Sequence, residues 1–111
     1  MAGSFELYKD RSDEFRFRLK AGNGEIILAS EGYKQRTSAE NGIESVRANA
    51  PDDERYERKE TKNGGHMFNL KATNGQVIGT SEVYTSTGGR DNGIESVRKN
   101  APEAEVKDLT G

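Results

Sequence analysis

The chain has 111 residues, and its charged residues (32%) slightly outnumber its apolar ones (31%). This length fits one small domain with a thin core, such as one layer of helices on one sheet. A net charge of −2 excludes a strong global attraction to nucleic acid or anionic membranes, and the absence of cysteine excludes disulfides, thiolate metal sites and thiol catalysis.

The first elements expected along the chain are three strands. Residues 5–8 and residues 15–21 alternate apolar and polar side chains, which predicts two half-buried strands. Asn23 and Gly24 follow, and this pair favours a two-residue hairpin turn, in which both central positions need a positive φ. Residues 25–30 are therefore expected to form the return strand.

A helix is expected after these strands. Thr37 and Glu40 have the spacing of a capping box, in which Thr37 accepts a hydrogen bond from a free backbone amide and Glu40 reaches back. Pro51 is expected to end the helix, and residues 54–59 are expected to form a closing strand. Apolar side chains recur on one face of this helix at Ala39, Ile43, Val46 and Ala50.

The second half of the chain repeats the first at a fixed offset. Residues 41–47 return unchanged as residues 92–98, an offset of 92 − 41 = 51, and no gap is needed anywhere. Self-similarity at a fixed period predicts that both halves fold alike. Gly88 and Gly89 replace the first residues of the capping box, so the second helix is expected to have the weaker cap.

Two tandem β-β-β-α-β repeats, at residues 5–55 and 56–106, are therefore expected within one domain spanning residues 1–111. Each repeat alone, at about 50 residues, is expected to be only marginally stable. Joining the strands into one sheet would bury both helices. The predicted fold class is α+β, with a single mainly antiparallel sheet, two helices packed on one face, and closing strands swapped between the repeats.

The order of these motifs resembles the bacterial YegP family over essentially the whole chain. The resemblance implies this same swapped-strand fold, with single-repeat relatives forming the sheet as dimers, and it implies no activity and no catalytic residues. Copy two departs where Gly79 replaces Leu28 and His66 replaces Phe15. The motifs that carry the resemblance are Phe17-x-Leu19-Lys20-Ala21-x-Asn23-Gly24-x-x-Ile27, Ser30-Glu31-x-Tyr33 and Asn41-Gly42-Ile43-x-Ser45-Val46-Arg47-x-Asn49-Ala50.

Charged and titratable side chains give weak candidate sites. His66 is the only histidine, lacks a nearby carboxylate in residues 62–65 and replaces an apolar residue, so a structural or surface role is favoured over a base or metal ligand. The acidic clusters at residues 10–14 and 52–54 do not match the spacing of a calcium loop, which favours solvated loop charge.

Glycine lies in the first turns of both predicted helices, at Gly42 and Gly93. One interpretation is an anion site at each helix N-terminus. Glu40 and Asp91 would repel an anion there. The favoured interpretation is that each glycine lets its helix approach the sheet closely.

The face of the sheet that the helices leave open is the best candidate for function. If residues 15, 17 and 19 face the helices, the alternate side chains point the other way. A plain solvated face is the competing interpretation. The candidate partner-binding residues are Arg16, Arg18, Lys20, Ile26, Leu28, Met67, Asn69, Lys71 and Val77, none of them aromatic.

We therefore expect a non-enzymatic binding or accessory module that uses this open face for a protein or peptide partner. The alternative is weak binding of single-stranded nucleic acid through the basic side chains of the face. An enzyme of unknown reaction comes third, because no catalytic residues, cofactor or metal site can be named.

The location and the oligomeric state follow from what the sequence lacks and what it repeats. No apolar run approaches the about 20 residues needed to cross a bilayer, and residues 1–6 lack the features of a signal peptide. We therefore expect a cytoplasmic protein with no membrane partner. It is expected to be a monomer, because the tandem repeat replaces a dimer.

Overall fold

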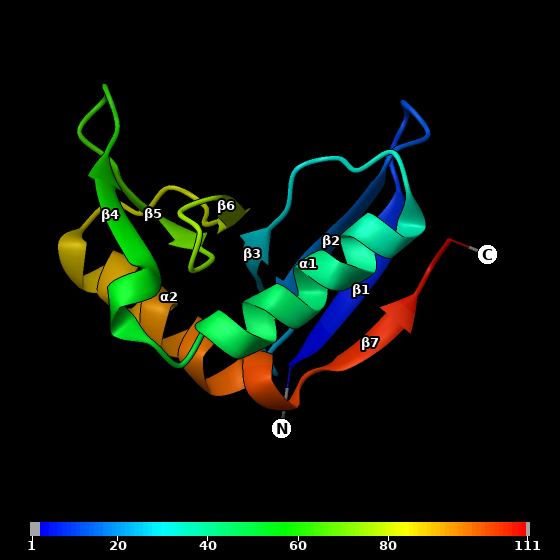
Figure 1. Cartoon of the computed structure of the whole chain (residues 1–111). Helices are drawn as coiled ribbons and strands as arrows, with labels where there is room; N and C mark the ends of the chain where they lie inside the picture. Colours follow the sequence, from blue (N-terminus) through cyan, green and yellow to red (C-terminus); the bar gives the residue numbers. More distant parts are fainter. Residues whose placement is uncertain (1–2, 111) are drawn as a thin grey trace.

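A computed structural model of the chain describes residues 3–110, which form seven strands and two long helices (Figure 1). Two short 3-10 helices, Asp53–Arg55 and Ala101–Glu103, lead from the long helices into β4 and β7. In chain order the elements are β1 (Ser4–Lys9), β2 (Phe15–Lys20), β3 (Ile26–Ala29), α1 (Arg36–Asn49), β4 (Tyr56–Glu60), β5 (His66–Lys71), β6 (Val77–Thr80), α2 (Thr87–Asn100) and β7 (Glu105–Asp108).

All seven strands join one sheet in the order β4-β5-β6-β3-β2-β1-β7. Five neighbouring pairs are antiparallel, and only β1 and β7 run parallel. The two halves meet where β3 and β6 pair through Ala29 and Thr80. The predicted α+β class with a single, mainly antiparallel sheet is confirmed.

The closing strands are exchanged between the repeats, as predicted. β7 belongs to the second repeat but lies beside β1 of the first, at the opposite side of the molecule from β4 (Figure 1). The closing residues of the first repeat form β4, which pairs with β5 and therefore also serves as the first strand of the second half. One chain thus forms the continuous sheet that the resemblance leads us to expect of a dimer.

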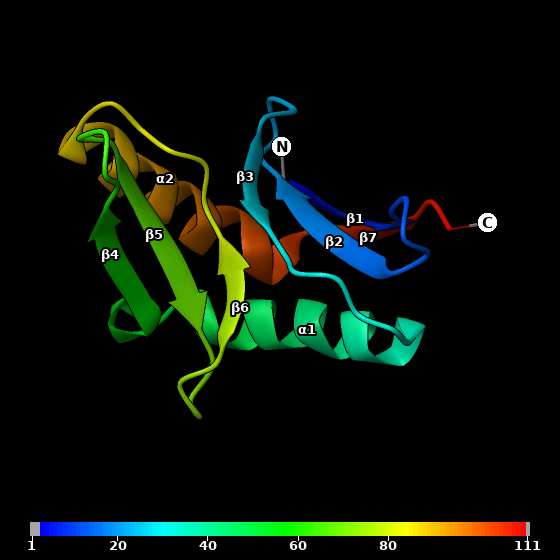
Figure 2. The same cartoon turned by 90° about the horizontal axis from the view of Figure 1, so that it is seen from above.

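The core lies between the sheet and the two helices: α1 packs on β2 and β6, and α2 packs on β5 and β3 (Figure 2). The inward side chains of β1, β2 and β5 meet the apolar faces of α1 and α2, so the alternation and the helical spacing in the sequence both point to this core. The largest fully buried side chains are Phe5, Leu7, Phe17, Leu19, Leu28, Ile43, Val46, Phe68, Leu70, Ile94 and Val97.

A β-bulge in β3 places one residue that was predicted for the open face on the other side of the sheet. Leu19 pairs with Leu28, whereas Lys20 pairs with Ile26, so Ile27 is an extra residue in β3. The extra residue shifts the alternation, and both Ile27 and Leu28 are buried. The prediction that Leu28 lies on the open face beside Ile26 is therefore wrong. The second half has the same register shift in β6.

The hairpin between β2 and β3 is longer than the expected two-residue turn. The Ala21 N–H donates to the Glu25 carbonyl and the Gly24 N–H donates to the Ala21 carbonyl, both at 2.9 Å, which encloses a three-residue loop. Within this loop only Gly24 has a positive φ, of 89°. A type I turn followed by one left-handed residue needs glycine at that single position, and Asn23 instead accepts the Glu25 N–H at 3.0 Å.

The relative strength of the two helix caps is also the opposite of the prediction. Helix α1 begins at Arg36, so Thr37 lies inside the first turn, and Gln35 occupies the cap position without a side-chain hydrogen bond. In α2 the equivalent residue, Ser86, accepts a hydrogen bond from the Gly89 N–H at 3.0 Å. The second helix therefore has the better cap, because the offset of 51 residues places serine where the first repeat has glutamine.

We predict that Gln35→Ser increases the free energy of unfolding by about 0.5–2 kcal/mol, because the hydroxyl supplies an acceptor for a free amide of α1. The reverse change in the second repeat, Ser86→Gln, is expected to lower it by a similar amount. Urea unfolding of the two variants and the wild type measures both effects. An unchanged midpoint for both variants would contradict the prediction.

Candidate binding face of the sheet

The open face is the side of the sheet that carries neither helix. Arg16, Arg18 and Lys20 alternate along β2 with the buried Phe17 and Leu19, so their side chains lie on the open face. The face includes Glu6, Tyr8, Arg16, Arg18, Lys20 and Ile26 from the first half and Glu57, Lys59, Met67, Asn69, Lys71 and Val77 from the second. The structure thus gathers eight of the nine predicted residues, all except Leu28.

In the first half, a carboxylate lies at the centre of the predicted basic side chains. Glu6 on β1 accepts a hydrogen bond from Arg18 at 2.7 Å and lies 3.3 Å from the Lys20 ammonium. Arg16 is paired with Asp10 at 2.6 Å. Each of the three cations therefore already has an ion-pair partner, with two carboxylates serving three cations, and a ligand of one charge sign has no unpaired partner among them.

The second half retains this arrangement with a different set of residues. Glu57 occupies the position equivalent to Glu6 and lies 3.1 Å from Lys71 and 3.7 Å from Lys59. Asn69 donates to Glu57 at 3.3 Å and accepts from the Thr80 hydroxyl at 2.9 Å. Because Asn69 is only 9% exposed, its amide holds the face together instead of offering free groups to a partner.

Tyr8 is a residue of the face that our sequence interpretation missed. It lies on β1, and the Arg18 guanidinium carbon stands 4.7 Å from the centroid of its ring. The alternation in residues 5–8 contained the signal, because burial of Phe5 and Leu7 forces Glu6 and Tyr8 to the other side. The open face therefore carries a half-buried aromatic ring stacked under a cation.

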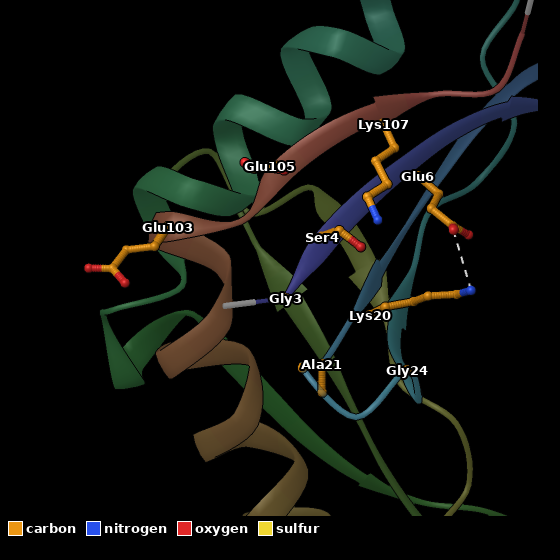
Figure 3. Close-up of a pocket in the computed structure, with 10 residues that line it drawn as sticks. Gly3, Ser4, Glu6, Lys20, Ala21, Gly24, Glu103, Glu105 and Lys107 are labelled. Atoms are coloured by element: carbon orange, nitrogen blue, oxygen red, sulfur yellow. Dashed lines mark ion pairs between the residues drawn. The ribbon is translucent and has the colours of Figure 1, made fainter. Parts of the chain in front are cut away.

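A shallow cavity of about 540 Å³ lies at the end of the face where β1 and β7 meet the loop after β2. Figure 3 shows Glu6, Lys20 and Lys107 projecting into this region, with Glu6 and Lys20 joined as an ion pair. Glu103 and Glu105 also line it, so its charges are of both signs. The cavity suits polar groups of either charge.

Glu6 gives the stability of the face a pH dependence. The hydrogen bond from Arg18, and then that from Lys20, hold the pKa of Glu6 below its ordinary value of 4.5. In the unfolded chain the pKa returns to that value, so the stabilisation is complete above about pH 4.5 and is lost as the pH falls through the lower pKa of the folded state.

We predict that Glu6→Gln loses less free energy of unfolding than the wild type when the pH falls from about 5 to about 3, because the glutamine has no carboxylate to protonate. Urea unfolding at each pH measures the difference. Glu57→Gln is the matched variant in the second half, since Lys71 and Asn69 lower the pKa of Glu57 as well. Parallel pH profiles for the wild type and Glu6→Gln would contradict the prediction.

The other candidates from the sequence, His66 and the acidic residues after β1, take part in hydrogen bonds with the backbone of the fold. His66 pairs with Tyr84 through two backbone hydrogen bonds of 2.8 and 2.7 Å. Asp10 accepts the Ser12 N–H at 2.8 Å and the Glu14 N–H at 3.0 Å, which fixes the loop between β1 and β2. Within residues 3–110, no three His, Asp or Glu side chains are placed to hold a metal ion together.

The helix glycines lie against aromatic rings of the other layer. A Cβ atom on Gly42 would lie 2.7 Å from Cε2 of Phe17, and one on Gly93 would lie 2.5 Å from the Tyr84 hydroxyl oxygen. Real Cβ atoms essentially never approach that closely. The interpretation that these glycines allow close packing of the helices is confirmed.

The sequence profile of a family described as a domain of unknown function, DUF1508, matches the chain twice, at residues 10–57 and 61–108. The two matches are 61 − 10 = 51 residues apart, the offset of the internal repeat. The bounds of the repeats, residues 5–55 and 56–106, and the single domain of residues 1–111 stay predictions.

Relatives match along essentially their whole length. A UPF0339 protein encoded 5′ of the ptx operon in Stutzerimonas stutzeri is 59% identical, covering 98% of both chains. The UPF0339 protein YegP of Escherichia coli K12 is 56% identical, over 99% of this chain and 100% of that protein. Both similarities include the tandem repeat.

Two solution NMR structures share the fold. That of YegP from E. coli superposes with a TM-score of 0.95 at 56% identity, covering 100% of this chain and 96% of that one. That of a UPF0339 protein from Shewanella oneidensis gives 0.93 at 54% identity, covering 99% and 93%. Over residues 3–110, neither helix combines the length and apolar character needed to span a bilayer.

Proposed function

The chain belongs to the DUF1508 family, with the UPF0339 proteins that it matches end to end, and on this premise we propose that it is a non-enzymatic binding module for a protein or peptide. The open face of the sheet is the binding surface. The observation that carries the proposal is its mixed character: Ile26 and Val77 are 43% and 41% exposed, and each pairs across strands with a lysine of the same face.

A peptide complements this surface better than a uniformly charged ligand does. Glu6 and Glu57 each lie among two or more cations, so the face alternates in sign along both halves. A peptide can offer both charges and apolar side chains within a few residues, which allows it to satisfy such a pattern. The carboxylates with shifted pKa values, at Glu6, Asp10 and Glu57, are all shifted downward, opposite to a catalytic acid.

The test is selection of binding peptides from a random displayed library, with the site mapped by NMR. Selected peptides are expected to shift the amide signals of β2 and β5 and to bind the Arg16→Glu, Arg18→Glu, Lys20→Glu triple variant about tenfold or more weakly, because close like charges oppose binding. The matched control reverses three exposed lysines elsewhere, Lys34, Lys62 and Lys99. Peptides that bind the triple variant as tightly as the control would remove this site.

Single-stranded nucleic acid is the second candidate, and Tyr8 is the observation that favours it. Base stacking on an exposed ring, with arginine nearby, is the usual way in which sheet faces bind single strands. Glu6 disfavours nucleic-acid binding, because its carboxylate lies at the centre of the basic side chains. Fluorescence anisotropy of labelled oligonucleotides in a salt titration decides: phosphate contacts must weaken steeply with salt, and absence of binding at low salt removes the candidate.

A monomeric state and a cytoplasmic location remain part of this proposal. The monomer is supported by a sheet whose two halves join within one chain, since β3 pairs with β6 and β7 returns to β1. Light scattering coupled to gel filtration is expected to give the mass of one chain, 12.2 kDa. A mass of twice that value would show that the tandem repeat does not replace the dimer.

A further inference from the structure

The two outer edges of the sheet are occupied differently although the two halves repeat each other. β1 of the first half pairs with β7 on its outer side. β4 is the equivalent strand of the second half, and within residues 3–110 no strand lies on its outer side. The reason is that the closing strand of the first repeat is β4 itself, so the second half is one strand short of the first.

The outer edge of β4 exposes the same backbone groups that β1 uses to pair with β7. Leu7 pairs with Phe17 in the first half, and Arg58 pairs with Phe68 in the second, each shifted by 51 residues. The Leu7 carbonyl accepts the Leu109 N–H at 2.7 Å on the side of β7. The Arg58 carbonyl is its equivalent, so it faces outward at the edge of β4.

The side chains along β4 define the strand that would fit there. In β7, the consecutive residues Glu105, Val106, Lys107 and Asp108 lie beside Ser4, Phe5, Glu6 and Leu7. The equivalents of those four β1 residues are Arg55, Tyr56, Glu57 and Arg58. A strand with the sequence of β7 would meet two opposite charges on β4, at Glu57 and Arg58, and a third at Arg55, the last residue of the preceding 3-10 helix. On β1 it meets one, at Glu6.

We propose that the outer edge of β4 binds an extended segment of a partner protein that runs parallel to it and carries an acidic–apolar–basic–acidic sequence. Backbone hydrogen bonds supply the affinity in such strand addition, and the side-chain pattern supplies the specificity. Arg58 is 37% exposed and pairs with Asp53 at 3.2 Å and Asp91 at 3.5 Å, both exposed carboxylates. An incoming carboxylate can therefore exchange with them at small cost.

The charges of this edge also decide which strands it rejects. Arg58, Lys59 and Glu60 are all exposed. Charged side chains at an edge oppose pairing with apolar strands. A second copy of the chain is disfavoured as the occupant, because its own Asp108 is held by an ion pair with Arg36 and by the Thr110 hydroxyl at 2.6 Å. The site goes beyond the open face, since it uses the edge of the sheet.

The test titrates a capped peptide with the sequence of residues 104–109, Ala-Glu-Val-Lys-Asp-Leu, into the isotope-labelled full chain. Amide signals of β4 are expected to shift and to gain protection from hydrogen exchange. A scrambled peptide and one with N-methylated backbone amides are expected to leave them unchanged, because the pattern and the hydrogen bonds are both required. Arg58→Glu is expected to weaken binding about twofold to fivefold, and a peptide with lysine in place of its aspartate is expected to restore binding to that variant.

Three results would overturn the proposal. The first is the absence of any β4 shift at millimolar peptide. The second is equal binding of the scrambled peptide. The third is self-association of the chain without peptide, measured by sedimentation and abolished by Arg58→Glu, which would assign the edge to a second copy.

Discussion

Leu28→Ala is expected to lower the free energy of unfolding by about 2–5 kcal/mol, the usual cost of a leucine-sized cavity in a packed core. Leu28 is only 1% exposed and lies at the seam where the two halves of the sheet join. Its side chain occupies the space beside Gly79 of β6, the residue 51 positions later. The seam therefore depends on a side chain that only one repeat supplies.

The pairing of leucine with glycine follows from the symmetry of the seam. A Cβ atom on Gly79 would lie 2.5 Å from Cδ2 and 2.6 Å from Cγ of Leu28. Two identical repeats meeting here would place the same residue on both sides of the axis. Within one chain the two positions can differ, so the Leu28 side chain fills the space that Gly79 leaves empty.

A double-mutant cycle tests this complementarity. Gly79→Ala alone is expected to cost about 1–3 kcal/mol by overpacking against Leu28. In the Leu28→Ala background the same change is expected to cost less or to stabilise, with a coupling energy of about 0.5–3 kcal/mol, because the added methyl group enters the cavity. The double variant Leu28→Gly, Gly79→Leu is expected to recover most of the free energy of unfolding that is lost when Leu28 alone is truncated. Strictly additive effects in urea unfolding would show that the two residues do not share one space.

The topology could be predicted from the sequence because two independent signals agreed. The exact return of residues 41–47 fixed the repeat, and the alternation in residues 15–21 fixed which side chains face the core. The swap of the closing strand followed from the overlap between the end of one repeat and the start of the next. The resemblance to a known family supported the same arrangement, and the family and fold are confirmed.

The errors arose where one residue changes the outcome. The bulge at Ile27 reverses the parity of β3, and nothing in residues 25–30 distinguishes a bulged strand from a regular one. The cap of α1 was misplaced by two residues, because Thr37 and Gln35 are both close enough to the start of the helix to serve. Boundaries of this kind depend on tertiary packing more than on local preference.

The open face was predicted by position but not by chemistry. Alternation correctly placed Arg16, Arg18 and Lys20 on one side of β2. The pairing of Arg18 and Lys20 with Glu6 depends on the register between β1 and β2, which sets Glu6 opposite Arg18. A basic strand in a sequence is therefore weak evidence for an anion-binding surface until its neighbouring strand is known.

Ser30→Ala is expected to lower the free energy of unfolding by about 1–3 kcal/mol, because it leaves a buried amide without a partner. Ser30 is 7% exposed, and its hydroxyl oxygen accepts the Phe17 N–H at 2.9 Å while donating to the Glu31 carbonyl at 2.8 Å. The serine side chain thus completes the ladder where the chain turns away after β3. Ser81 does the same for Phe68 in the second half, at 3.0 Å.

Both serines are needed because the backbone leaves β3 and β6 at the same point of the repeat. Ser81→Ala is accordingly expected to cost as much as Ser30→Ala, whereas Ser12→Ala, in an exposed loop, is the control and is expected to change the stability by less than about 0.5 kcal/mol. Hydrogen exchange of the Phe17 amide identifies the mechanism: in Ser30→Ala its protection should fall more than that of the Leu19 amide on the same strand. Equal loss at both amides would show a general destabilisation of β2 and not the loss of one hydrogen bond.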